Sequence, residues 1–89
     1  MQQMDVVVRS PYGLHARAAA RLTLAAQKFR SRIILVANGR RANARSLIAV
    51  MILAAGMGVC VSIEVQGPDE VEAMHEVAQL VASGFAQKT

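Results

Sequence analysis

The most constraining feature of this sequence is a segment, residues 59–66, in which apolar and polar side chains alternate. The apolar positions hold valine and isoleucine, and the positions between them hold Cys, Ser, Glu and Gln. Because successive side chains of a β-strand point to opposite faces of its sheet, this pattern predicts a strand with one face in the core and one face at least partly polar. Such a strand requires a second layer of structure that covers one face of the sheet.

Three further segments have the character of strands. Val6–Val8 is a β-branched run that ends in a loop containing Pro and Gly, so we predict a strand there. Residues 33–37 are mostly β-branched and apolar, and Asn38-Gly39 follows them. This pair suits a two-residue turn with positive φ at both positions, so 40–44 is predicted to form a hairpin with 33–37.

Three segments are predicted to be helices. In the first, from Ala16 to about Phe29, apolar residues recur at spacings of three and four. The second is short, from Leu47 to about Leu53, with Ser46 as its N-cap. The third begins where Asp69 or its neighbour caps it, with acidic side chains near its positive end. Its expected buried stripe comprises Val71, Met74, Ala78, Val81 and Phe85.

The predicted order of elements is β-α-β-β-α-β-α, within a single domain that spans residues 1–89. A chain of 89 residues, 54% of them hydrophobic, suits one compact domain. Helices that are amphipathic on one side imply that they pack over one face of an antiparallel sheet. The predicted fold is therefore α+β, an open-faced two-layer β-sandwich with a four-stranded antiparallel sheet covered on one face by three helices.

Composition argues against several classes of protein. Cys60 is the only cysteine, which excludes an internal disulfide and a multi-cysteine metal site. The uncharged stretch 47–63 is shorter than the roughly 20 apolar residues of a membrane span and contains Gly56 and Gly58. The start of the chain has no basic stretch followed by an apolar run. We therefore expect a cytoplasmic protein without membrane insertion, bound metal or cofactor.

The charge is distributed unevenly along the chain. Residues 1–45 contain nine Arg or Lys and one acidic residue, or +8, whereas residues 46–89 sum to −4. This asymmetry favours a basic surface that meets an acidic partner or a phosphate, with a mixed solvated surface as the alternative. A nucleic-acid-binding module is a weaker alternative. The only aromatic residues are Tyr12, Phe29 and Phe85, and two of these fall in helical core stripes, which leaves no stacking platform.

His15 is the strongest candidate for chemistry. It stands between a Gly-containing loop and a helix start, where the backbone N–H groups of Ala16 and Arg17 and the helix dipole can stabilise an anion. The guanidinium of Arg17 can bind phosphate oxygens, and an imidazole keeps a neutral, nucleophilic form at cellular pH. Gly13 is expected to let the backbone turn tightly without a side chain that blocks the ring. Spacing alone favours the simpler interpretation, a helix-start histidine and an exposed arginine. His75, among polar residues of the last helix, is assigned no role.

The wider sequence resembles the histidine-containing phosphocarrier (HPr) family over nearly its whole length. Gly13-Leu14-His15-Ala16-Arg17-Ala18-Ala19 resembles the active-site signature of the family. The segment from Asn43 to Met51 resembles the second signature, around a regulatory serine. The two signatures are as far apart in this sequence as they are in the family. Gly67-Pro68-Asp69-Glu70 and the helix after it are similar to the C-terminal portion of the family. Both the sugar-transport and the nitrogen-regulatory branch resemble this chain.

The resemblance implies a phosphocarrier of the phosphoenolpyruvate-dependent phosphotransferase system that is not an enzyme by itself. His15 would accept a phosphoryl group on a ring nitrogen from the first enzyme of the system and pass it to a downstream component. Arg17 and the backbone of Ala16 and Arg17 would hold the phosphate. The alternative is a regulatory binding module of the same fold. We expect a monomer.

The resemblance also implies a docking patch and a regulatory site. Leu47, Ile48 and Met51, together with Arg21, would form the patch that partners contact, consistent with Met as an adaptable contact residue. The alternative for the three apolar residues is ordinary core. Ser46 matches the serine that a dedicated kinase phosphorylates in some members and a phosphorylase restores, where added negative charge would hinder an acidic partner. The alternative for Ser46 is a plain helix cap.

The chain departs from the family pattern at two positions beside His15. Ala18 stands where the family commonly has proline, so the helix start is expected to be less rigid. Tyr12 replaces the small polar residue often found there. The contact that such a residue gives to the loop or to the phosphate is therefore not expected in this chain.

Overall fold

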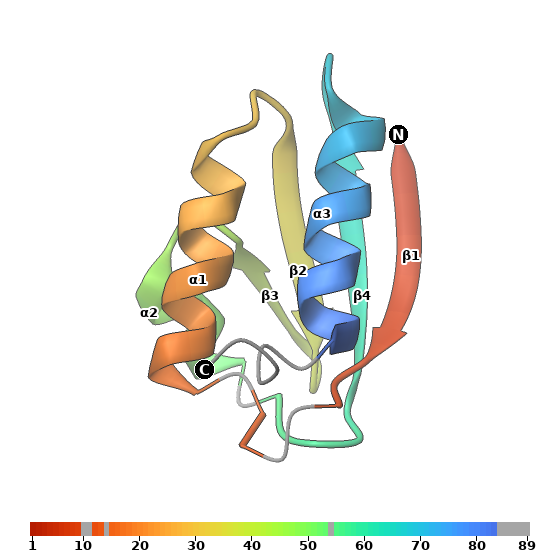
Figure 1. The fold of residues 1–89 in the computed structure, drawn as a ribbon. Helices are drawn as coiled ribbons and strands as arrows, with labels where there is room; N and C mark the ends of the chain where they lie inside the picture. The colour runs from red at the N-terminus through yellow and green to blue at the C-terminus, as the bar shows by residue number, and fades with distance from the viewer. Residues whose placement is uncertain (10–11, 14, 54, 84–89) are drawn as a thin grey trace.

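The computed structural model describes residues 1–9, 12–13, 15–53 and 55–83, which form a four-stranded sheet with helices packed against it (Figure 1). The four strands are β1 (Gln2–Val7), β2 (Arg32–Ala37), β3 (Arg40–Asn43) and β4 (Cys60–Gln66). The three helices are α1 (Ala16–Gln27), α2 (Leu47–Ile52) and α3 (Glu70–Ser83). The order of elements and the open-faced α+β class are those predicted from the sequence.

The alternating segment forms an interior strand of the sheet. The strand order is β1-β4-β2-β3 and every pair is antiparallel. Ile63 of β4 lies opposite Met4 of β1 on one side and opposite Leu35 of β2 on the other. The hairpin between β2 and β3 turns at Asn38-Gly39, both with positive φ, as predicted.

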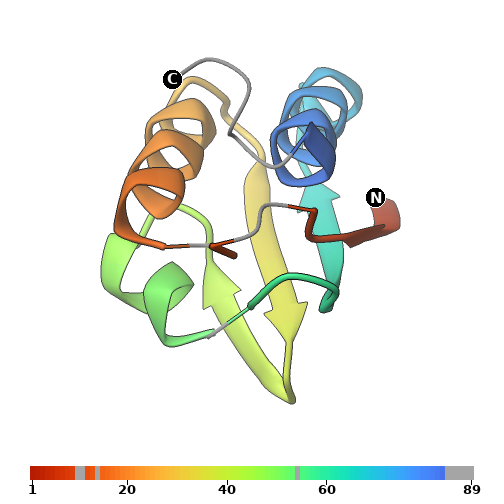
Figure 2. The same cartoon turned by 60° about the horizontal axis from the view of Figure 1, so that its bottom comes forward.

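The core lies between the sheet and the two long helices. Helices α1 and α3 cover one face of the sheet, while α2 packs against α1 and β3 (Figure 2). The side chains that are completely buried come from both layers and include Leu22, Ile33, Leu35, Leu53, Ile63 and Val77. Each such side chain stabilises the fold by roughly 1.5–3 kcal/mol relative to an exposed one.

Strand β1 is longer than predicted. It begins at Gln2 rather than Val6 because antiparallel pairing with β4 continues to Gln2, which lies opposite Val65. The first residues of β1 lack the β-branched side chains that mark a strand in sequence. They form a strand because they occupy an edge of the sheet, where main-chain pairing on one side is sufficient.

The buried stripe predicted for α3 is confirmed at three of its residues but not at its first. Met74, Ala78 and Val81 are buried, but Val71 is 62% exposed, and the prediction for it was wrong. Ala73 and Val77 complete the buried face instead. Val71 lies in the first turn, at the edge of the helix face that Ala73 and Val77 turn toward the core. Phe85 lies outside the described residues.

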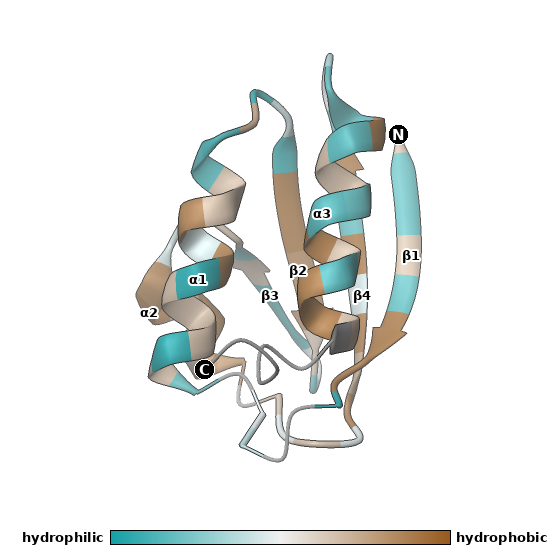
Figure 3. Cartoon of the chain, in the orientation of Figure 1, coloured by the Kyte–Doolittle hydropathy of each residue, from teal (hydrophilic) through white to brown (hydrophobic). Residues whose placement is uncertain are grey.

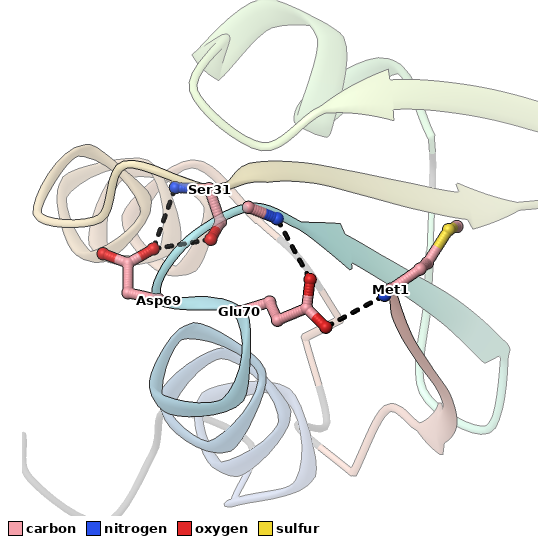
Figure 4. A network of polar contacts seen from close by, with 5 residues as sticks. Met1, Ser31, Asp69 and Glu70 are labelled. Carbon is pink, nitrogen blue, oxygen red and sulfur yellow. Dashed lines mark hydrogen bonds and ion pairs between the residues drawn. The ribbon is translucent and has the colours of Figure 1, made fainter.

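The start of α3 is tied to the start of β2 through Asp69 (Figure 4). Its carboxylate accepts hydrogen bonds from the backbone N–H groups of Arg30 and Ser31, each at 2.9 Å, and from the Ser31 hydroxyl at 2.5 Å. Asp69 directly precedes α3, as predicted, and its carbonyl accepts from the N–H of Ala73 at 3.0 Å, while its carboxylate binds the start of β2. Ser31 is completely buried in this contact.

Gly67 and Glu70 complete this junction. Gly67 has a φ of +152°, and a Cβ there would lie 2.6 Å from both Cα and Oγ of Ser31. Its N–H donates to one carboxylate oxygen of Glu70 at 3.1 Å, and the other oxygen pairs with the amino group of Met1 at 2.9 Å (Figure 4). The lack of a side chain at Gly67 is thus what allows Ser31 to reach Asp69.

We predict that Asp69→Asn lowers the thermal midpoint at neutral pH but not in acid. Hydrogen bonds, first from the Ser31 side chain and then from the Arg30 backbone, hold the pKa of Asp69 below its ordinary value of 3.8. A carboxyl group with a lowered folded pKa stabilises the fold above its unfolded pKa, and this contribution is lost as the pH falls through the folded pKa. Thermal melts of the two proteins should therefore converge as the pH falls below 3.8.

Glu72→Gln is the matched control, because Glu72 is an exposed acid in the first turn of the same helix. Because Glu72 lies near the positive end of the helix, Glu72→Gln should lower the thermal midpoint only slightly, by less than Asp69→Asn does at neutral pH. A difference between wild type and Asp69→Asn that stays constant down to the lowest pH would contradict the role given to the charged carboxylate.

Candidate functional site

The candidate site lies at the end of the sandwich where the segment after β1 leads into α1 (Figures 1 and 2). His15 is the N-cap residue of α1, with an extended backbone at φ −71° and ψ 179°, and its carbonyl accepts from the N–H of Ala19 at 2.8 Å. Its side chain is partly exposed and makes no capping hydrogen bond to α1. The imidazole is therefore not used to complete the described part of this helix.

The electrostatic setting of His15 favours an anion. The first backbone N–H groups of a helix, here those of Ala16 and Arg17, have no carbonyl partner within the helix. The first turn of α1 contains no acidic residue, so the positive end of the helix dipole is not neutralised from within that turn. The side chain of Arg17 is exposed, and Arg21 lies one turn further along, partly buried.

Gly13 fixes the position of the segment before α1. It has a φ of +65°, and a Cβ there would lie 2.5 Å from the carbonyl oxygen of Ala55 and 2.7 Å from Cα of Gly56. The tight turn predicted at this glycine is confirmed by its left-handed φ, and its contact with a second backbone segment was not predicted. The side chain is absent because two backbone segments meet there, one before α1 and one between α2 and β4.

Tyr12 contacts His15, which the sequence did not predict. Their ring centroids are 5.9 Å apart and the ring planes are inclined at 82°, an edge-to-face arrangement. Tyr12 is 78% exposed and lies outside the core. The residue that departs from the family pattern thus touches the candidate nucleophile. Ala18, the other departure, is completely buried.

Ser46 is the N-cap of α2, as predicted. Its hydroxyl oxygen accepts a hydrogen bond from the backbone N–H of Ala49 at 3.3 Å, and the side chain is exposed. The neighbouring Arg45 donates from its guanidinium to the carbonyl of Phe29, just beyond the end of α1. Cations are favourable at that end of a helix, so Arg45 ties α1 to the start of α2.

Most of the apolar side chains of α2 are exposed. Leu47, Ile48 and Met51 are 38%, 65% and 41% exposed, so the alternative that these residues are ordinary core is wrong for all three. Ile52, which was not singled out from the sequence, is also exposed, and Val50 is the buried residue of the helix. Figure 3 shows α2 as a largely hydrophobic ribbon beside α1.

Neither His75 nor Cys60 joins this site, and both are exposed. Among the described residues, no three His, Cys, Asp or Glu side chains gather where they could hold a metal ion. No helix within the described ranges is long and apolar enough to cross a bilayer.

Comparison with known proteins agrees with the fold. Residues 2–83 match the family described as PTS HPr component phosphorylation site. The chain is 45% identical over 87 residues to the phosphocarrier protein HPr of Cupriavidus necator, with 98% of each chain covered. It is similar to the crystal structure of HPr-C-His from Thermoanaerobacter tengcongensis, with 31% identity, a TM-score of 0.92 and 100% of both chains covered. The structure of an HPr dimer from the same organism gives 32% identity and a TM-score of 0.76, with 98% of this chain and 100% of that chain covered.

An open-faced sandwich of this topology, with these relatives, defines a phosphocarrier of the phosphotransferase system. Such a protein is a substrate and a donor in the reactions of partner enzymes and not an enzyme itself. The chain belongs to the HPr family. Membership implies interaction with the enzymes of the phosphotransferase system, and the resemblance stated from the sequence is confirmed.

We predict that Gly13→Ala destabilises the fold by about 1–3 kcal/mol, because an L-residue is strained at this φ and the Cβ would meet backbone atoms. Gly56→Ala is the control, since a Cβ at Gly56 would meet nothing within 4 Å. Chemical denaturation of both variants measures the difference. Equal stability of Gly13→Ala and the wild type would show that the two loops can separate without cost.

Proposed function

We propose that His15 is the phosphoryl acceptor and donor of this phosphocarrier and that Arg17 stabilises the phosphate. The observation that carries this proposal is that His15 occupies the N-cap position of α1 without using its side chain as the cap. A side chain at an N-cap lies within reach of the first free N–H groups of its helix. A phosphate on the imidazole would therefore meet the backbone N–H groups of Ala16 and Arg17 and the positive end of the dipole.

The transfer itself needs little from the carrier beyond positioning and charge. The lone pair of a ring nitrogen of His15 forms the bond to phosphorus while the bond between phosphorus and the donor group breaks, and its electron pair leaves with that group. In the onward step the N–P bond breaks, and its electron pair returns to the imidazole. The guanidinium of Arg17 and the helix N–H groups counter the charge on the phosphoryl oxygens in both steps.

The test is intact-mass spectrometry after incubation with phosphoenolpyruvate and the first enzyme of the phosphotransferase system. Wild type and the control His75→Ala should each gain one phosphoryl group that acid removes, because phosphohistidine is acid-labile. His15→Ala should gain none. Uptake of acid-labile phosphate by His15→Ala would place the site elsewhere, and no uptake by wild type would remove the proposal altogether.

We further propose that partners dock on the exposed side chains of Leu47, Ile48 and Met51, together with Arg21. Support comes from the exposure of all three apolar residues on a helix that packs beside α1. Burial of one such aliphatic side chain at an interface is worth roughly 1.5–3 kcal/mol. We also propose what was expected from the sequence: a cytoplasmic location, a single domain over residues 1–89 and a monomer. Sedimentation velocity of the protein alone measures its oligomeric state.

Ile48→Asp should raise the KM of the first enzyme for this carrier about tenfold or more, because a charge would replace an apolar side chain that is buried only in the complex. Val71→Asp is the control, since Val71 is equally exposed but lies on α3, in the first turn. Steady-state transfer kinetics measure both variants. A KM for Ile48→Asp equal to that of Val71→Asp would move the docking surface away from α2.

The same assay tests Ser46 as a regulatory phosphosite served by a serine kinase and phosphorylase. Its exposed hydroxyl caps α2 immediately before the docking residues. Asp and Asn both serve well as N-caps, so Ser46→Asp and Ser46→Asn keep the helix start and differ in charge. Only Ser46→Asp should raise KM, and equal values for the two variants would leave Ser46 as a plain helix cap.

A further inference from the structure

We propose that Tyr12 is a positioning residue for His15: its aromatic ring holds the imidazole in the orientation from which it exchanges a phosphoryl group. This inference rests on the proposed role of His15 and adds a residue that stands outside the family pattern. The two rings are separated by 5.9 Å between centroids and inclined at 82°. These values fall within the range of favourable edge-to-face aromatic pairs.

The imidazole needs the restraint that an aromatic neighbour provides, because it has no capping hydrogen bond to α1. An N-cap side chain is usually fixed by a hydrogen bond to the first turn of the helix, and His15 makes none to α1. The torsion between Cβ and an imidazole ring is broad and weakly restricted by itself. An aromatic neighbour narrows this torsion without consuming the nitrogen lone pair that attacks phosphorus. A hydrogen-bonding side chain in the same place would compete for a ring nitrogen.

The backbone around Tyr12 makes its ring a defined partner. Gly13 follows directly, and its left-handed φ and its contact with the backbone of Ala55 and Gly56 fix the direction of the chain at this point. Tyr12 itself is largely exposed and contributes nothing to the core. Its contact with His15 is therefore not a consequence of hydrophobic burial.

An exposed tyrosine beside a reactive residue also suits a docking contact, and the two roles have different kinetic signatures. A residue that orients the imidazole acts on the transfer step and changes kcat. A residue that contacts the partner in the bound complex changes KM. Orientation of the imidazole also exists in the free protein, where no partner is present, so it can be observed without any transfer reaction.

The experiment compares Tyr12→Phe with Tyr12→Leu. Phe keeps the ring, whereas Leu keeps apolar bulk and removes the ring. In NMR spectra of the free proteins, the ring-proton resonances of His15 should keep their positions in Tyr12→Phe and move in Tyr12→Leu, where the ring current is lost. The resonances of His75, which is far along the chain on α3, serve as the internal control.

With the first enzyme, Tyr12→Leu should lower kcat by about two- to fivefold with KM unchanged. Tyr12→Phe should leave both unchanged.

Unchanged kcat in Tyr12→Leu would overturn the proposal, and so would a rise in KM with kcat unchanged, which would make Tyr12 a docking contact. Unchanged His15 resonances in Tyr12→Leu would show that the rings do not meet in solution, again overturning it. The proposed function fails by a different observation, acid-labile phosphate on His15→Ala. The NMR comparison is independent of that result because it needs no phosphoryl transfer.

Discussion

The antiparallel pairing of β1 with β4 is the constraint on which the rest of the structure depends. In this register Val7, at the end of β1, lies opposite Cys60, at the start of β4. The segment that leaves β1 toward α1 and the segment that enters β4 from α2 must therefore meet at one end of the sheet. The pairing of these two strands therefore brings the segment that leads to His15 beside the segment that follows α2.

The fold could be predicted wherever local chemistry and tertiary packing agree. The alternation in 59–66, the Asn38-Gly39 turn and the Ser46 cap each express a local rule that the structure obeys. The prediction for Val71 failed because the buried face of α3 is centred nearer Ala73 and Val77 than the predicted stripe was, which leaves Val71 at its edge. The Asp69–Ser31 contact was not predicted, because it joins residues that are distant in sequence and a capping rule considers only the helix that follows.

The residues of the candidate site could be proposed from the sequence, but their surroundings could not. His15 and Arg17 were singled out because a helix start and a resemblance both pointed to them. The contact of Tyr12 with His15 and the approach of Gly13 to Ala55 depend on the path of the chain before α1, which no periodicity encodes. The exposure of Leu47, Ile48 and Met51 could be expected from the resemblance but not from the pattern, because a short helix of apolar residues looks the same in sequence whether it is core or surface.

The close approach of Gly13 to Ala55 and Gly56 has a consequence for how this protein can change over evolution. Connections between elements usually accept insertions and deletions with little cost, because each is a separate excursion into solvent. Here two connections are in backbone contact. A residue inserted between α2 and β4 would therefore displace the backbone that Gly13 packs against, in the loop that leads to His15. The two loops can therefore change length only together, and drift in one is limited by the chemistry of the other.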